Sequence, residues 1–87
     1  MKIYYTSEFS RRYKRLSQEI KERAKEKERI FCKNHFDSRL KTHKLNGTTD
    51  NYWAFSVDYN YRIIFKFYKK NSVIFIAICD HSIYKDF

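Results

Sequence analysis

Apolar residues recur every three or four positions through the first third of the chain, the spacing of a helix with one buried face. This stripe comprises Phe9, Tyr13, Leu16, Ile20, Ala24 and Phe31, and most basic residues lie off it. A single straight helix over residues 7–34 would run about 42 Å, which is too long for a domain of this size. We therefore expect two helices, with a break at residues 16–19 and Ser17 as the N-cap of the second.

Residues on either side of this helical region predict where it begins and ends. Residues 2–5 alternate in the manner of a short strand, and Thr6 and Ser7 are good N-cap residues for the first helix. Residues 34–38 form a polar interruption that favours an Asx turn and ends the second helix.

Beyond residue 40 the apolar period changes from 3.6 to 2, which indicates strands. Lys41–Leu45 is a short predicted strand, and the only glycine, Gly47, lies in the turn that follows it. From Trp53 onward, every second residue is apolar or aromatic as far as Tyr61, as expected for a strand with one packed face.

Two polar reversals divide the rest of the chain into two more strands. Asp58, Tyr59 and Asn60 form the first reversal and lead into a strand over 61–68, while residues 69–71 form the second and lead into a strand over 73–79. The last strand is apolar on both faces and should therefore be central in the sheet.

These elements predict one small α+β domain over residues 1–87, with the order β-α-α-β-β-β. An N-terminal strand and a helical hairpin pack on an antiparallel meander. A chain of 87 residues with 43% apolar and 20% aromatic residues can fold around a core but has no room for a large cofactor. We expect no cofactor.

The chain is strongly basic, with 19 Lys or Arg against 10 Asp or Glu and a formal net charge of +9. A field of this sign favours polyanions, nucleic acid first, although an acidic protein or an anionic membrane surface is also compatible with it. The simplest alternative is a solvated surface that only keeps the protein soluble.

No apolar run is long enough to span a bilayer, since the longest, Val73–Cys79, falls far short of the roughly twenty residues required. The first residues lack the apolar segment of a secretory signal. Cys32 and Cys79 form no C-x-x-C pair, so we expect reduced thiols in a cytoplasmic protein.

The common catalytic motifs are missing from the sequence. Cys32 and His35 could meet on one helical turn, but a zinc site needs about four ligands, so we expect no metal site. One glycine cannot build a phosphate-cradling loop or a nucleophile elbow. A Cys–His nucleophile stays open, although Cys79 in the most apolar strand is better explained as packing.

Cationic and imidazole groups instead gather near the predicted strand ends. They are Lys41, His43, Lys44, Arg62, His81 and Lys85, together with Tyr84. The period of two places Lys41 and His43 on one face of their strand, and Arg62 on one face with Lys66. Cleaving RNA without a metal requires a base for the 2′-OH, a cation for the phosphorane and an acid for the 5′-oxygen, and His and Arg can fill these roles.

Each of these residues also has an ordinary structural explanation. A lone histidine is more often a plain surface side chain, which suits His35 better than His81. Arg62 could be an exposed strand residue paired with Asp58 or Asp80. Tyr52, Tyr59 and Tyr68 could stack on bases, but aromatics at sheet period are more often core.

Three stretches of the chain resemble the RelE/ParE superfamily of toxins from bacterial and archaeal type II toxin–antitoxin systems, particularly its RelE and YafQ-like branch. They are residues 36–47 (FDSRLKTHKLNG), residues 52–65 (YWAFSVDYNYRIIF) and residues 80–84 (DHSIY). The resemblance implies a ribosome-dependent mRNA interferase that is held inactive by a cognate antitoxin wrapped around it.

The resemblance also implies roles for single residues. His43 matches a functional histidine of YafQ-like members, Arg62 the phosphate-contacting arginine of the RelE branch, and His81 a C-terminal general acid or base. Tyr84 resembles the aromatic after that histidine, although it follows three positions later where many members have four. Four lysines are expected to contact RNA or the ribosome, namely Lys41, Lys44, Lys66 and Lys85.

Three functions remain open from the sequence. The first is a metal-independent endoribonuclease with His43 as base, Arg62 as phosphorane stabiliser and His81 as acid. The second is a non-enzymatic, ParE-like toxin that inhibits DNA gyrase through the basic helical hairpin. The third is a basic module that binds RNA without cutting it.

Overall fold

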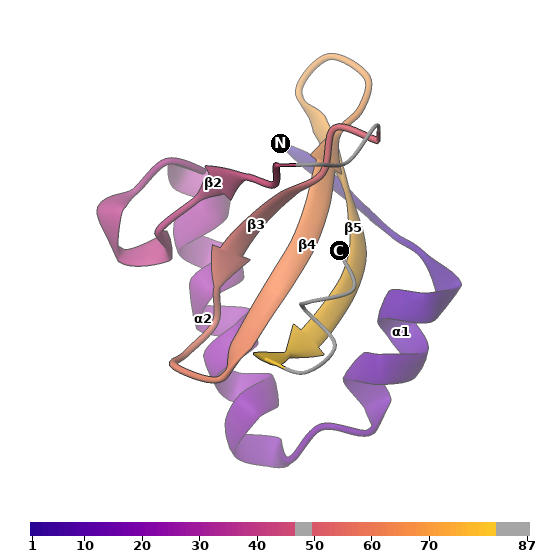
Figure 1. The fold of residues 1–87 in the computed structure, drawn as a ribbon, viewed down its shortest axis with the longest axis vertical. Helices are drawn as coiled ribbons and strands as arrows, with labels where there is room; N and C mark the ends of the chain where they lie inside the picture. The colour runs from indigo at the N-terminus through magenta and orange to yellow at the C-terminus, as the bar shows by residue number, and fades with distance from the viewer. Residues whose placement is uncertain (47–49, 82–87) are drawn as a thin grey trace.

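The structure of the chain, a computed structural model, describes residues 1–46 and 50–81 (Figure 1). Its elements are β1 (Lys2–Tyr5), α1 (Ser7–Lys14), α2 (Gln18–Lys33), a 3₁₀ turn η1 (Ser38–Leu40), β2 (His43–Lys44), β3 (Trp53–Ser56), β4 (Tyr61–Phe67) and β5 (Ser72–Asp80). In this described part of the chain, no helix is long and apolar enough to cross a membrane.

The five strands form one mixed sheet in the order β1-β5-β4-β3-β2. β2 to β5 are an antiparallel meander, and β1 joins β5 in parallel. The predicted α+β class and the meander are therefore confirmed. β5 has a strand on each side, which agrees with its apolar residues on both faces.

Both predicted helix starts are confirmed by their caps. The Thr6 hydroxyl accepts a hydrogen bond from the Phe9 amide at 3.0 Å, and the Ser17 hydroxyl accepts one from the Ile20 amide at 3.3 Å. Each cap satisfies one of the amides that a first helical turn leaves without a partner. The chain therefore breaks where the sequence predicted and folds back as a hairpin.

We call the face of the sheet that α1 and α2 cover the helix face. Its core is aromatic: the Phe31 ring lies 4.8 Å from Phe55, 5.0 Å from Phe65 and 5.6 Å from Phe75 between centroids. All four rings are fully buried. α2 passes behind the sheet in Figure 1, and α1 lies along its β5 side.

We call the other side, which faces the viewer in Figure 1, the opposite face. Its buried residues are smaller: Leu45, Ala54, Ile64, Ala77 and Cys79. A bulge in β5 leaves Ile76 without a partner between the pairs Ile64–Ala77 and Phe65–Phe75. The Thr6 hydroxyl donates to the Ile76 carbonyl at 2.6 Å, so the first helix cap also anchors the bulge.

Two predicted strands are shorter in the structure. The strand expected over Lys41–Leu45 is only His43–Lys44, because Lys41 takes a left-handed conformation (φ 52°) to close the 3₁₀ turn. The alternation that begins at Trp53 holds as far as Val57, and Tyr59 stands 92% exposed in the reversal. Both differences arise at turns, where local hydrogen bonds override the strand period.

Candidate active site

The side chain of Arg62 is fixed at one of its three nitrogens. Its Nη1 donates to the carbonyls of Asp58 at 2.9 Å, Tyr61 at 3.1 Å and, more weakly, Tyr59 at 3.4 Å. Nε and Nη2 make no hydrogen bond with the described residues. The guanidinium is therefore oriented by the backbone while two donors stay available for an anion.

The turn that holds Arg62 is itself held by the carboxylate of Asp58. Oδ1 accepts hydrogen bonds from the amides of Asn60 at 2.8 Å and Tyr61 at 2.9 Å. Oδ2 lies 3.5 Å from Nη1 of Arg23, which ties the turn to α2. A helix and an Asx turn thus cooperate to place one arginine.

The ring of His43 has a defined tautomer. Its Nδ1 lies 2.9 Å from the carbonyl oxygen of Lys41, which can only accept, so Nδ1 carries the proton. In the neutral ring the lone pair is therefore on Nε2, the atom that can take a proton from a substrate.

Arg62 and His43 share the opposite face of the sheet. His43 pairs with Ala54, and Arg62 pairs with Ser56 on one side and Cys79 on the other. The two residues are thus two strands and two positions apart, about 12 Å between Cα atoms at ordinary sheet spacing. Because the guanidinium turns toward the 58–61 reversal, it points away from His43.

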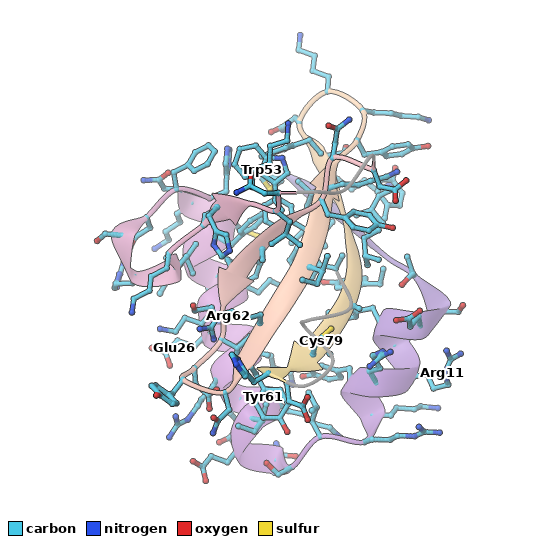
Figure 2. The ribbon with its side chains drawn as sticks, viewed as in Figure 1. Arg11, Glu26, Trp53, Tyr61, Arg62 and Cys79 are labelled. Carbon is cyan, nitrogen blue, oxygen red and sulfur yellow. The ribbon has the colours of Figure 1, made fainter. Side chains whose placement is uncertain are left out.

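His81 lies at the same end of the sheet as Arg62. It follows directly after β5, two residues beyond Cys79, and is exposed. Figure 2 shows Arg62 and Cys79 on neighbouring strands at this end. The fold therefore brings Arg62 and His81 to one end of the sheet and leaves His43 farther along the face that carries Arg62.

Comparison with solved structures shows which known fold this is. The chain superimposes on a YoeB/ParE toxin from Agrobacterium tumefaciens with a TM-score of 0.77 at 19% identity, covering 93% of this chain and 99% of that one. YafQ from Escherichia coli strain BL21(DE3) gives 0.77 at 20%, covering 94% of each chain. A RelB–RelE antitoxin–toxin complex from Methanococcus jannaschii gives 0.74 at 24%, covering 97% and 98%. This chain has the RelE/ParE toxin fold.

Sequence comparison finds less than the structures do. No family model matches the chain, and no curated protein matches it. The RelE/ParE fold is thus carried here by a sequence that shares fewer than a quarter of its residues with these three structures.

The RelE/ParE fold distributes the predicted lysines over different surfaces. Lys66 is half-buried on the opposite face, in register with Ile74. Lys44 pairs with Trp53 and therefore lies on the helix face, whereas His43 lies on the opposite face. The prediction that Lys41 and His43 share a strand face is wrong, since Lys41 precedes β2. Tyr84 and Lys85 lie outside the described residues.

Charges near His43 stabilise the segment that presents it. Asp37 caps η1 through the Arg39 amide at 2.9 Å and also binds the Arg39 side chain through both carboxylate oxygens. The side-chain and backbone hydrogen bonds from Arg39 lower the pKa of Asp37 to about 2. This turn precedes the Lys41 carbonyl that orients the His43 ring.

The cysteines lie away from these groups or are buried. Cys79 is 1% exposed among small apolar residues, and Cys32 is on α2, where partial burial and then Glu28 raise the pKa of its thiol. Across residues 1–46 and 50–81, no three His, Cys, Asp or Glu side chains gather as metal ligands.

The sequence did not predict the contacts that hold the side chain of Arg62 in place. An Asp two residues before Asn60 is an Asx-turn signal and could have suggested the role of Asp58. Nothing in the sequence indicates that Arg23, 35 positions earlier in the numbering, reaches this turn, because that contact depends on how α2 crosses the sheet.

Proposed function

We propose that this chain is the toxin of a type II toxin–antitoxin pair and that it cleaves mRNA on the ribosome without a metal ion. The fold shared with YoeB/ParE, YafQ and RelE toxins supports the toxin role. The net charge of +9 supports a polyanionic substrate.

One observation carries the nuclease part of this proposal. Arg62 is locked through Nη1 by turn carbonyls, and its remaining donors lie at the same end of the sheet as His81. A guanidinium fixed before the substrate arrives stabilises the charge of a pentacoordinate phosphorane without reorganising. A histidine at that end of the sheet can protonate the leaving oxygen as a general acid.

The reaction then runs as an internal transfer within the RNA. A base removes the proton of the 2′-OH, the 2′-oxygen forms a bond to phosphorus, and the bond from phosphorus to the 5′-oxygen breaks. His81 supplies the proton that this oxygen takes up, which leaves a 2′,3′-cyclic phosphate and a 5′-hydroxyl. Nε2 of His43 is the proposed base, and it and Arg62 must both reach the same phosphodiester linkage across the roughly 12 Å that separates their Cα atoms.

Substitutions of His43 test whether its ring acts as the base. His43→Asn keeps a donor near the Nδ1 position and removes Nε2, whereas His43→Gln does the reverse. If Nε2 is the base, both variants lose cleavage by about a hundredfold or more, because neither amide can take the proton. His35→Gln is the matched control, since His35 packs against Phe31 and Phe67 on the other face.

The decisive assay maps mRNA 5′ ends on purified ribosomes and in cells that express the chain alone. Arg62→Ala and His81→Gln should each abolish the new ends, while Arg11→Ala, which removes an exposed guanidinium on α1, should leave them. Arg62→Lys should restore little, because an ammonium lacks the planar fork. Growth arrest with intact mRNA and inhibited gyrase would refute the nuclease and support the ParE-like alternative.

We also propose that a cognate antitoxin neutralises this chain. The M. jannaschii structure is a RelB–RelE complex, and a DinJ–YafQ complex has the same toxin fold at a TM-score of 0.75. Between α1 and α2 lies a pocket of about 390 Å³ with an apolar floor that includes Phe9 and Ala24. Lys14 and Lys25 are on its rim, so an apolar side chain flanked by acidic residues suits it.

The pocket also contains an ordered polar pair. The Tyr5 hydroxyl donates to Glu28 at 2.7 Å, and burial together with this bond raises the pKa of Tyr5. The tyrosine therefore stays neutral and keeps the wall of the pocket in place.

A further inference from the structure

Lysines and tyrosines alternate on the opposite face at the end of the sheet away from Arg62. One row across the strands consists of Lys66 on β4, Ile74 on β5 and Tyr4 on β1. The next row has Ser72 in the middle, with Lys2 paired on one side and Tyr68 hydrogen-bonded through its amide at 3.0 Å on the other. In both rows a cation stands across β5 from an aromatic ring.

We call Lys2, Tyr4, Lys66, Tyr68 and Lys69 the hairpin-end patch, because they surround the β4–β5 hairpin at the top of Figure 1. The two rings meet edge to face at 5.6 Å and are 36% and 48% exposed. Lys2 lies 4.9 Å from the centroid of Tyr4, and Lys69 lies 5.4 Å from that of Tyr68. The rings are thus held in place yet open to solvent.

The charge of the patch has one sign. Residues 1–7 and 61–79 contain no Asp or Glu. Among the described residues, none of the ion pairs uses Lys2, Lys66 or Lys69. A protein partner would need matching carboxylates here, whereas a nucleic acid supplies phosphates at every step and bases for the rings.

We propose that the hairpin-end patch is a binding subsite for single-stranded RNA, with a base stacked on one ring of the Tyr4–Tyr68 pair and phosphates beside Lys2 and Lys66. In an edge-to-face pair only one ring gives its face to the other, so the ring that offers its edge keeps the side opposite its lysine for a base. Lys66 lies four residues from Arg62 on the same face, about 13 Å along β4. A strand crossing this face therefore reaches the patch and Arg62 together.

This inference rests on the proposed function, since it extends the proposed RNA-binding surface along the same face. A measurement of RNA binding without cleavage distinguishes the failure of one proposal from the failure of the other. Fluorescence anisotropy with the full chain and a 2′-O-methylated oligoribonucleotide, which lacks the attacking hydroxyl, measures affinity without cleavage. Whichever of Tyr4→Ala and Tyr68→Ala removes the stacking ring should weaken binding about tenfold, the usual effect of losing one base–aromatic stack, and the other substitution should weaken it less. Tyr68→Trp, which keeps an aromatic ring, should bind the RNA with about the affinity of the parent.

The lysines give a second, independent measure. Lys2→Ala and Lys66→Ala should each reduce the slope of log affinity against log salt by about 0.7, the value for one phosphate contact on a single strand. Phe36→Ala and Lys25→Ala are the controls, since Phe36 is an exposed ring that packs against Trp53 on the helix face and Lys25 is on α2. Neither should change affinity or slope beyond the small loss from net charge.

The outcomes decide between the two proposals. Unchanged RNA affinity in folded Tyr4→Ala and Tyr68→Ala overturns the subsite, even where those variants weaken binding to an antitoxin. Weakened affinity with no cleavage by the parent chain supports the subsite and refutes the nuclease. Thermal melting of each variant confirms that it is folded, and an unchanged salt slope in both lysine variants also counts against the subsite.

Discussion

Removing the carboxylate of Asp58 should loosen the turn that orients Arg62, while the guanidinium proposed to contact the substrate stays in the protein. The side chain is 14% exposed, accepts two backbone amides and faces Arg23 at 3.5 Å, while the carbonyl of the same residue accepts from Arg62. Asp58→Ala removes all the side-chain contacts and keeps the carbonyl. Any effect on Arg62 then reports on the turn.

The expected loss of stability is the sum of three small contributions. Each of the two hydrogen bonds from backbone amides contributes about 1 kcal/mol. The ion pair adds less than about 1 kcal/mol, because Arg23 is half exposed. Asp58→Ala should therefore lower the free energy of unfolding by about 2 to 3 kcal/mol, and Arg23→Ala by less than about 1 kcal/mol.

Urea unfolding measures the stability, and cleavage of ribosome-bound mRNA measures the activity at a temperature where each variant is folded. Asp58→Ala should lower kcat/KM about tenfold or more, since a misplaced guanidinium stabilises the phosphorane poorly. Asp58→Asn should keep most of the activity, because its amide oxygen can accept the same two amides. Full activity in a folded Asp58→Ala variant, beside an inactive Arg62→Ala, would refute positioning by this turn.

Three further predictions test other parts of the molecule. Ser10→Trp places an indole in the pocket between α1 and α2, so it should abolish neutralisation in a co-expression growth assay and leave toxicity intact; retained neutralisation would exclude the pocket. Asp37→Asn should lower the urea midpoint at pH 6. The difference from the parent should close as the pH falls from about 4 toward 2. Because the folded protein lowers the pKa of Asp37 to about 2, the stabilisation by its charge is fully present above the usual pKa of an aspartate and is lost as the pH falls through about 2. Phe31→Ala should cost about 3 to 5 kcal/mol of unfolding free energy, since its fully buried ring contacts three others; a loss below 1 kcal/mol would contradict the packing.

Much of the fold could be predicted because its signals are local. The caps at Thr6 and Ser17 follow from side-chain oxygens that reach amides three residues ahead. The reversals at 58–60 and 69–71 follow from polar residues that tolerate turns, and Asn71 takes a left-handed conformation (φ 57°) as such residues do. The 3₁₀ turn at Ser38–Leu40 was not predicted, since it depends on the Asp37–Arg39 contact.

The candidate site was predictable only as a set of residue types. Imidazoles and a guanidinium near strand ends indicate RNA chemistry, but the strand period cannot tell how far apart they lie. The fold separates His43 from Arg62 by two strands and gathers Arg62 with His81 instead. The tautomer of His43 also depends on the left-handed turn at Lys41, which no alternation reveals.

The sequence by itself determined the helical hairpin, the meander, the interior position of the apolar strand β5 in the sheet and the strongly basic charge, because these depend on neighbours in the chain and on composition. Tertiary structure alone decided that β1 lies parallel beside β5, which brings Tyr4 to Tyr68, and that α2 carries Arg23 to the turn at Asp58. Such contacts join residues tens of positions apart. Their geometry is set by sheet order and helix crossing, which arise from burying the aromatic core as a whole.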